Sequence, residues 1–179
     1  MATKRAVKKV KKKIAKAKSR PKSGGNAKVK AKAAPVAVTP YLCCKGAAAA
    51  LEFYKTGFGA RERLRMTSSD GTIGHAEILI SGAPVFVSDE YPNMGVSSPI
   101  SVGGTPVTIH LYVRDVDAFV TKALAAGATQ LGAVEDMPYG DRQGTIRDPF
   151  GHRWMVATRK EVVGKAVLKK RMGEMFKVS

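Results

Sequence analysis

The sequence predicts an α+β fold made of two similar modules, each with the order strand, helix, strand, strand, strand. The main observation is an internal repeat, because V-T-P-Y-L-C-C-K at 38–45 returns about 69 residues later as V-T-I-H-L-Y-V-R at 107–114. A Gly-Ala pair follows each copy, at 59–60 and at 127–128. One module is too small to bury a good core alone, so we expect the two to pack together with a ligand cleft between them.

The first module opens with a strand in the first copy of the repeat. A helix is predicted from Ala47 to Thr56, and Gly57 ends it. Alternating or apolar runs then predict three strands: Ala60–Met66, Gly74–Ile80 and Pro84–Asp89.

The second module repeats this order with clearer signals. A strand is predicted at Thr108–Val113, and a helix begins at Arg114 or Asp115, with acidic residues in its first turn. Apolar residues at helical spacing form one face of that helix, which ends at Gly127: Val116, Phe119, Val120, Ala123 and Leu124. The remaining strands are predicted at Thr129–Val134, Gly144–Arg147 and Arg153–Thr158.

Charge divides the chain into a tail and a folded part. Residues 1–38 hold 14 of the 31 Lys and Arg residues and none of the 14 acidic ones, so they carry +14 of the net +17. Without aromatic residues and rich in Lys and Ala, residues 1–36 are predicted to be a disordered basic arm. We expect one domain at 37–158, and a basic C-terminal helix within 159–179 that covers the cleft or a partner surface.

The arm has several possible roles. Its charge would attract nucleic-acid phosphates through residues such as Lys8, Lys9, Lys11, Lys12 and Lys13. Because no aromatic side chain is available to stack on bases, such binding is expected to be non-specific. A solubilising extension and a targeting segment stay open as alternatives. The +3 on the rest of the chain is expected to be too small and too dispersed for strong phosphate binding.

The two cysteines and the hydropathy of the chain indicate in which cellular compartment the protein works. Cys43 and Cys44 are adjacent in a strand, where they point to opposite faces, so they are not expected to form a disulfide framework. No apolar run reaches the roughly 18 residues of a membrane span. We therefore expect a cytoplasmic protein without a membrane partner.

Several segments together are similar to one known family. The chain resembles the vicinal oxygen chelate superfamily, which includes glyoxalase, bleomycin-resistance and extradiol-dioxygenase proteins, and within it the bacterial PhnB-like branch. The resemblance covers about residues 37–158 and is carried by L-E-F-Y-K-T-G-F-G-A (51–60), I-G-H-A-E-I-L-I (73–80), G-G-T-P-V (103–107), H-L-Y-V-R-D-V-D (110–117), A-A-G-A-T (125–129) and Y-G-D-R-Q-G-T-I-R-D-P-F-G-H-R-W (139–154). It implies a glyoxalase-like cleft but not a substrate.

The resemblance also carries an expectation about metal. Active members hold a divalent ion with His, Gln or Glu at four positions, which correspond here to Thr39, Phe86, Thr108 and Met155. Phenylalanine has no donor atom, methionine is a soft thioether, and threonine is a poor ligand for a hard cation. We expect neither the usual metal nor a cofactor.

The resemblance implies that Phe86 and Met155 are apolar walls of the cleft. If Thr39 and Thr108 also face the cleft, strand alternation places Tyr41, His110 and Tyr112 there, and the apolar alternation of the 73–80 strand adds His75 and Glu77. The Gly71-Thr72-Ile73 segment recurs as Gly144-Thr145-Ile146, and this repeat places Arg142 on the cleft face. The predicted ligand-binding set is Tyr41, His75, Glu77, Phe86, His110, Tyr112, Arg142 and Met155. Such a pocket suits an anionic or hydrogen-bonding small molecule.

Each of these residues also has a structural interpretation. His75 and Glu77 could be an exposed strand pair or part of an unusual metal site, and His110 a satisfied structural histidine. Asp141 and Arg142 could neutralise one another in a surface turn. Elsewhere, Trp154 and His152 are expected on the helix-facing side, and Cys43 as an inert buried thiol.

The sequence favours a PhnB-like protein that binds a small molecule in a metal-free cleft, and it leaves open whether any reaction is catalysed. One alternative is a metal-dependent lyase or dioxygenase with displaced ligands such as His75, Glu77 and His110. Another is a nucleic-acid-associated protein that acts through the basic arm. We expect a homodimer, although the cleft could form within one chain or across two.

Overall fold

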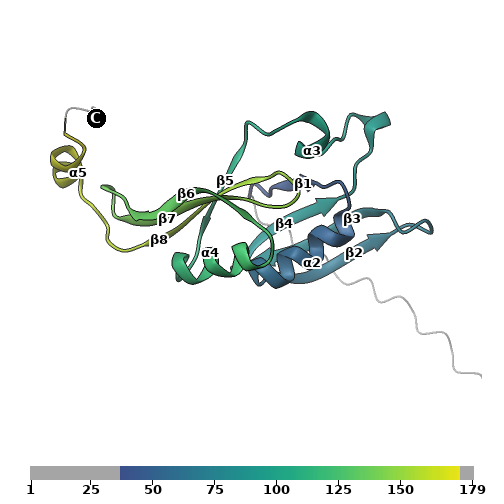
Figure 1. Cartoon of the computed structure of the whole chain (residues 1–179), viewed down its shortest axis with the longest axis horizontal. Helices are drawn as coiled ribbons and strands as arrows, with labels where there is room; N and C mark the ends of the chain where they lie inside the picture. Colours follow the sequence, from purple (N-terminus) through teal and green to yellow (C-terminus); the bar gives the residue numbers. More distant parts are fainter. Residues whose placement is uncertain (1–36, 174–179) are drawn as a thin grey trace, which may run out of the picture. The chain divides into compact units, whose positions relative to one another are not determined.

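The computed structural model describes residues 37–173 (Figure 1). The predictions made for residues 1–36, including the five lysines of the arm, and for residues 174–179 lie outside this range. No helix within it is long and apolar enough to cross a membrane.

The structure confirms the α+β fold with two βαβββ modules. Each module forms a four-stranded mixed sheet, with strand orders β1-β4-β3-β2 and β5-β8-β7-β6. The first module contains β1 (Tyr41–Cys43), α2 (Ala47–Phe58), β2 (Arg61–Thr67), β3 (Ile73–Ile80) and β4 (Ala83–Ser88). The second contains β5 (Thr108–Tyr112), α4 (Val116–Ala125), β6 (Thr129–Asp136), β7 (Asp141–Arg147) and β8 (Arg153–Arg159).

Three short helices lie outside the repeated pattern. The connection between the modules holds the 3-10 helix η1 (Pro92–Met94) and α3 (Pro99–Val102), neither of which was predicted. The side chain of Ser98 caps α3 by accepting the amide of Ser101. Helix α5 (Lys165–Met172) lies within the predicted C-terminal helix and is shorter than it.

The two long helices are capped in different ways. Asp115 accepts the amide of Ala118 and caps α4, as its sequence indicated. Helix α2 begins after a glycine and has no side-chain cap of its own. Its first amides, those of Gly46 and Ala47, donate instead to Asp89, which follows β4 and also accepts the amide of Ile73. One carboxylate thereby ties the start of α2 to two strands of its sheet.

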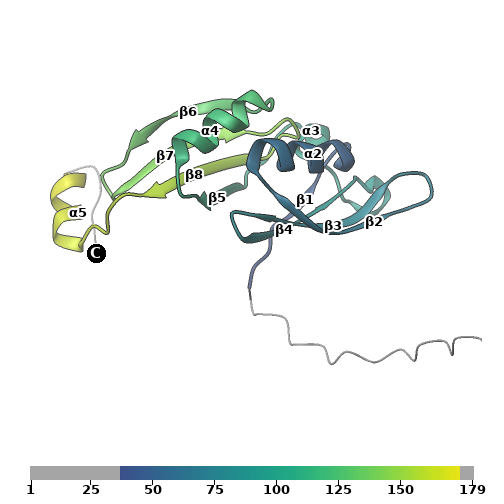
Figure 2. The same cartoon turned by 90° about the horizontal axis from the view of Figure 1, so that it is seen from below.

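Helices α2 and α4 lie against each other and join the modules, as Figures 1 and 2 show. Aromatic side chains of α2 pack against Trp154 of β8, with ring centroids 6.0 Å away for Tyr54 and 5.1 Å for Phe58. Phe58 also contacts Phe119 of α4 at 4.9 Å. Trp154 is fully buried, so its predicted place in the core is confirmed. The core is thus shared between the modules.

A buried carboxylate links the modules at the turn between β7 and β8. Asp148 is 3% exposed, and its Oδ2 atom accepts the hydroxyl of Tyr54 at 2.7 Å and the indole N–H of Trp154 at 2.9 Å. Its Oδ1 atom accepts the amides of Phe150 and His152. All four donors are therefore satisfied by one side chain.

Candidate functional site

Each sheet covers a helix with one face and leaves the other face open. Partners directly opposite in a ladder share a face. In the first sheet Phe86 pairs with both Tyr41 and Glu77, and Glu77 pairs with Leu64. The open face therefore carries Tyr41, Glu77 and Phe86, together with His75 two residues before Glu77. We call Tyr41, His75, Glu77 and Phe86 the His75 patch.

The residues of the His75 patch contact one another. The hydroxyl of Tyr41 lies 2.9 Å from Nδ1 of His75, within hydrogen-bond distance. The ring of Phe86 is edge-on to His75 at 4.9 Å and to Tyr41 at 5.7 Å. Nε2 of His75 lies 3.7 Å from a carboxylate oxygen of Glu77. Four residues of the predicted ligand-binding set thus form one aromatic and polar surface.

The open face of the second sheet is more strongly charged. His110 pairs with Met155, and Tyr112 pairs with Ala157, which in turn pairs with Gln143. The imidazole of His110 is exposed and lies edge-on to Tyr112 at 4.7 Å. We call the second surface the Arg159 patch, and it consists of His110, Tyr112, Asp141, Gln143, Met155 and Arg159.

A hydrogen-bonded cluster lies at the centre of the Arg159 patch. The hydroxyl of Tyr112 donates to Asp141 at 2.7 Å and accepts from Arg159 at 2.5 Å. The Arg159 side chain also bonds Asp141 at 3.3 Å, and its guanidinium lies 4.7 Å from the centre of the Tyr112 ring. Asp141 is 4% exposed whereas the Arg159 side chain is 56% exposed, so the cation faces solvent and the anion does not.

Residues 160–163, which follow β8 and are called the C-terminal segment below, form one wall of a pocket over this cluster. The pocket has a volume of about 480 Å³ and is lined by His110, Tyr112, Tyr139, Asp141, Gln143, Met155, Arg159, Glu161, Val162 and Val163. The carbonyl of Gly140 holds the segment by accepting the amides of Lys160 at 2.9 Å and Glu161 at 3.1 Å. Arg171 forms an ion pair with Glu161 and donates to the carbonyl of Pro138.

Tyr139 contributes a further polar group to this pocket. Its hydroxyl donates to Gln143 at 3.0 Å. Partial burial and the carboxylate of Asp141 raise the pKa of Tyr139 above its ordinary value.

The placement of Arg142 on the cleft face is wrong. Its guanidinium forms a two-pronged ion pair with Asp117 of α4, with both distances 2.8 Å, on the helix side of the sheet. The Gly-Thr-Ile repeat gave a wrong alignment of the two modules. Phe86 and Met155 hold equivalent positions in the structure, and each pairs with a residue of the neighbouring strand: Phe86 with Glu77, and Met155 with Thr145. Glu77 of β3 is therefore equivalent to Thr145 of β7. Aligning the two Gly-Thr-Ile segments instead shifts β7 against β3 by an odd number of residues. Side chains alternate between the two faces of a strand, so this shift predicts the wrong face for every residue of β7.

Two structural interpretations are also wrong. Asp141 does not neutralise Arg142 in a surface turn, since it is buried and bonded to Tyr112 and Arg159. His110 is not a buried structural histidine, because its side chain is exposed.

Sequence reasoning missed three residues of the Arg159 patch, namely Asp141, Gln143 and Arg159, and also Tyr139, which lines the pocket over it. Ile146 and Gly144 of β7 face the helix, so by alternation Gln143 and Asp141 face the open side. The correct alignment of β7 with β3 would have predicted both. Arg159 lies one residue beyond the predicted strand. Tyr139 precedes the strand, and no local signal marked it.

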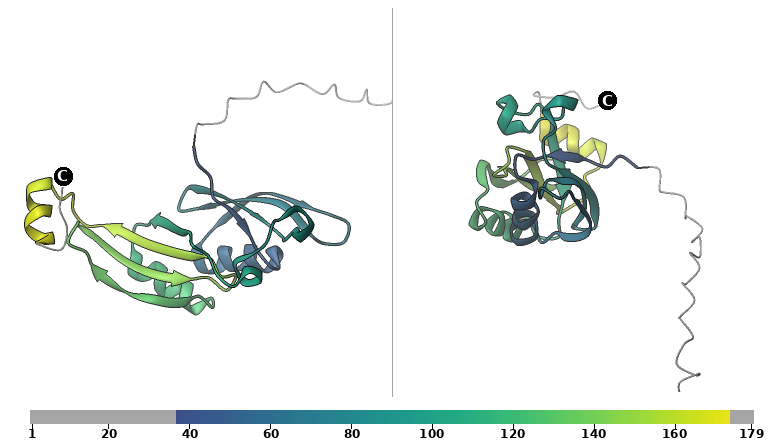
Figure 3. Two further views of the ribbon diagram at one scale, coloured as in Figure 1. Left: turned by 90° about the horizontal axis from the view of Figure 1, so that it is seen from above. Right: turned by 90° about the vertical axis from the view of Figure 1, so that its right-hand side faces the viewer.

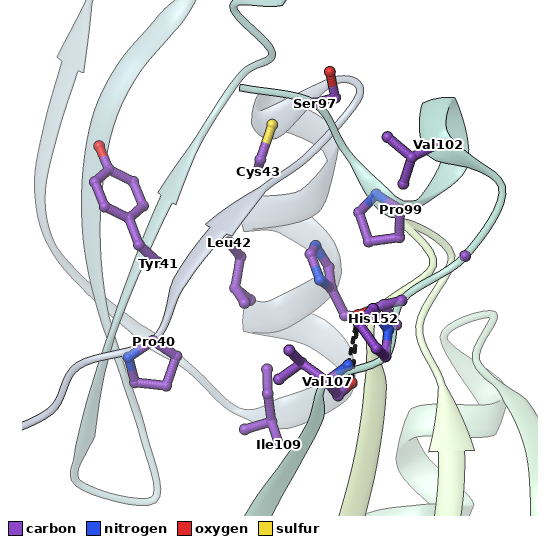
Figure 4. Close-up of a pocket in the computed structure, with 13 residues that line it drawn as sticks. Pro40, Tyr41, Leu42, Cys43, Ser97, Pro99, Val102, Val107, Ile109 and His152 are labelled. Atoms are coloured by element: carbon purple, nitrogen blue, oxygen red, sulfur yellow. Dashed lines mark hydrogen bonds between the residues drawn. The ribbon is translucent and has the colours of Figure 1, made fainter. Parts of the chain in front are cut away.

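A second, apolar pocket lies beside β1 (Figure 4). It has a volume of about 330 Å³, and its lining includes Pro40, Pro99, Val102, Val107 and Ile109. The imidazole of His152 points into it in Figure 4, and its Nε2 atom lies 3.6 Å from the Sγ atom of Cys44.

The groups around this pocket are held in their neutral forms. Burial lowers the pKa of His152 and raises the pKa of the Cys44 thiol. His152 is buried and lies next to Cys44. Cys43 is half-buried rather than buried, and burial with Glu90 and Asp89 raises its pKa, which opposes thiolate formation.

The residues at the family's metal positions do not fit a metal ion. Phe86 and Met155 lie on the two open faces, where they offer an aromatic ring and a thioether. Within residues 37–173, no group of three His, Cys, Asp or Glu side chains is placed to hold a metal. His75 and Glu77 approach each other, but His110 lies on the other sheet, so one chain does not assemble the displaced ligand set. Whether the purified protein is free of metal stays a prediction.

Comparison with known proteins identifies the family. Residues 34–156 match the family model of the Glyoxalase/Bleomycin resistance protein/Dioxygenase superfamily. An uncharacterized protein of Mycobacterium tuberculosis is 49% identical over 121 residues, which cover 66% of this chain and 71% of that protein.

Two solved structures illustrate the shared fold. TioX from Micromonospora sp. ML1 is 28% identical with a TM-score of 0.54, covering 69% of this chain and 99% of its own. A PhnB protein from Bacillus cereus has a TM-score of 0.52 at 20% identity, covers 68% and 98% of the two chains, and shows the fold alone. The resemblance found in the sequence is confirmed, and the chain belongs to the Glyoxalase/Bleomycin resistance protein/Dioxygenase superfamily.

Proposed function

We propose that this protein binds a small organic molecule, without a metal, in a cleft that two copies of the chain form together. The observation that carries the proposal is that each open sheet face presents a connected set of aromatic and hydrogen-bonding side chains. These sets are the His75 patch and the Arg159 patch. Among residues 37–173, no hydrogen bond, ion pair or aromatic contact joins one patch to the other.

The edges of the sheets support pairing between two copies. The outer edges, β2 and β6, have register shifts and charged residues such as Arg61, Arg63 and Asp136, which oppose pairing with another strand. The opposite edges, β1 and β5, are short and carry no Lys, Arg, Asp or Glu. Placing β1 of one chain near β5 of its partner would bring a His75 patch and an Arg159 patch into one cleft.

The chemistry of the patches favours a flat molecule with an anionic group. The rings of Tyr41, His75 and Phe86 offer an aromatic surface on one side of the proposed cleft. On the other side, the exposed guanidinium of Arg159 keeps donors in addition to those bonded to Tyr112 and Asp141. Arg159 therefore takes the role that the sequence assigned to Arg142.

The cysteines support a reducing compartment. Both are free, and neither is placed in a disulfide. We therefore keep the cytoplasm as the proposed location.

A mixing experiment tests the shared cleft. The probe is 8-anilinonaphthalene-1-sulfonate, an aromatic anion with a flat naphthalene ring, and its fluorescence reports binding to full-length protein. His75→Ala and Arg159→Ala are each expected to weaken probe binding at least tenfold, which corresponds to the loss of one charge-assisted or aromatic contact. Light scattering is expected to give the mass of a dimer.

Mixing the two variants then separates the possible arrangements. If subunits exchange at random and each cleft takes one patch from each chain, about a quarter of the clefts are intact in the mixture and bind the probe at the original affinity. Each variant mixed with itself is the control. A monomeric mass, or a mixture that recovers no binding after exchange, contradicts the shared cleft.

A further inference from the structure

The charge outside the basic N-terminal segment is concentrated, not dispersed. Residues 39–158 contain ten basic and twelve acidic residues, a balance of −2. Residues 159–179 contain seven basic and two acidic residues, a balance of +5. The expectation that the remaining +3 is spread over the folded part is therefore wrong, and the excess lies at the C-terminal end.

Helix α5 presents much of this charge to solvent. It follows β8 and lies beyond the second sheet, on the side away from the first (Figures 1 and 3). None of its residues is buried, and Lys165, Lys169 and Lys170 are exposed. Within the described part of the chain these three lysines form no ion pair, whereas Arg171 is paired with Glu161. Arg171 anchors the helix, and the lysines are left pointing to solvent.

The helix dipole accounts for only part of the charge of α5, because it favours Lys169, Lys170 and Arg171 in the last turn but not Lys165 in the first. Lys165 lies in the first turn, where the helix dipole favours acidic residues, and the first turn has none. Lys169 follows Lys165 by four residues, so two like charges lie on neighbouring turns and repel each other. The helix also contributes no buried side chain to the core. A bound polyanion would offset this repulsion.

We propose that α5 is a binding surface for the phosphate backbone of nucleic acid. Lysines one helical turn apart match a polymer with closely spaced negative charges. Ala166, Val167 and Leu168 are consecutive and spread around the helix, and the one apolar pair on a single face, Leu168 and Met172, is half-buried, so α5 exposes no broad apolar face that would insert into a membrane. With no aromatic residue in α5, binding depends on charge and not on base sequence. This surface is separate from the proposed cleft.

A charge-matched pair of full-length variants tests the proposal. The first carries Lys165→Gln, Lys169→Gln and Lys170→Gln, which keep good helix propensity. The control carries Lys45→Gln, Arg63→Gln and Lys122→Gln, which remove the same charge from exposed sites elsewhere. Affinity for a 30-base-pair DNA duplex and for a single-stranded RNA is measured across salt concentrations, and circular dichroism checks that both variants fold.

The α5 variant is expected to lower the magnitude of the log–log salt slope by about 2 to 3, as follows from roughly 0.9 per lost phosphate contact. Its affinity at 0.1 M salt should fall at least about tenfold, while the control slope should change by less than about 1. The DNA and RNA arms show which polymer is preferred.

Two outcomes overturn the proposal. Equal slope changes in the two variants would mean that only net charge matters. Displacement of the nucleic acid by poly-L-glutamate at equal charge concentration would mean that the surface binds acidic polypeptides as readily.

Discussion

The two modules share one topology, but the turns between their last two strands differ. In the first module, β3 and β4 are joined by Ser81 and Gly82, both with positive φ angles, in a tight hairpin. In the second, the turn between β7 and β8 is longer and contains Asp148, whose carboxylate reaches Tyr54 of the first module. The repeat thus preserves the strand order, while the contact that joins the modules comes from a feature present in one copy only.

The largest expected effect comes from the longer turn. Asp148→Ala would leave two side-chain donors and two amides without a buried acceptor, so the free energy of unfolding should fall by roughly 3–5 kcal/mol. Ser81→Ala, in the corresponding turn of the first module, should change it by less than about 1 kcal/mol. Urea unfolding measures both. If both variants lost a similar free energy of unfolding, the two turns would not differ in their contribution to stability.

The β2–β3 and β6–β7 turns offer a second comparison. Gly71 and Gly140 have φ angles of 89° and 98°, so alanine is strained at both, by about 1–2 kcal/mol. A Cβ atom at position 140 would lie 2.6 Å from the carbonyl oxygen of Glu161, whereas at position 71 it would meet nothing within 4 Å.

Gly140→Ala is therefore expected to lower the free energy of unfolding by about 1 kcal/mol more than Gly71→Ala. It should also displace the C-terminal wall of the pocket and speed tryptic cleavage after Lys160. Thermal unfolding and limited proteolysis measure the two effects. Equal behaviour of the variants would show that the C-terminal segment is not held against this turn.

The longer turn also brings a titratable group into the core. Burial keeps His152 neutral in the folded protein at pH values where the unfolded chain is already protonated, so the unfolded state binds more protons. The free energy of unfolding should therefore fall as the pH drops below about 6.5 and level off below the lowered pKa. His152→Gln should remove this part of the pH dependence, and His110→Gln, at an exposed position, should retain it. Parallel pH profiles for all three proteins would contradict the assignment.

The smallest expected effect concerns both modules equally. The family's metal positions hold Thr39 and Phe86 in the first module and Thr108 and Met155 in the second. Without a competent ligand set, no metal is coupled to folding, so EDTA should change Tm by less than about 1 °C. Zinc, nickel or iron held tightly at one equivalent per chain would refute this prediction.

Much of the fold was predictable because its signals are local. Alternation and helical spacing placed α2, α4 and the strands to within a few residues, and Asp115 was found as a cap. The His75 patch was also predictable, since His75 and Glu77 follow from strand alternation, and Tyr41 and Phe86 follow from the family's metal positions together with alternation. Helix α3 carries no periodic signal, because it is only four residues long.

The features that were not predicted depend on strand register and on contacts between residues far apart in the sequence. A three-residue repeat could not fix the alignment of β7 with β3, and an odd displacement moved Arg142 to the wrong face. Asp141 and Arg159 meet through strand pairing, which neither sequence segment reveals by itself. The concentration of charge at the C-terminal end was visible in the sequence, but its exposure on α5 was not.

The bond between Tyr54 and Asp148 joins residues 94 positions apart, and this separation bears on how the chain folds during synthesis. Until the second module has been made, the phenol of Tyr54 lacks its acceptor and α2 lacks the ring of Trp154 against which it packs. The first module is then a βαβββ unit with an uncovered aromatic helix face, which favours association with other chains. Despite the repeat, we expect the two modules to unfold in one cooperative transition and to complete their core only when the last strand is in place.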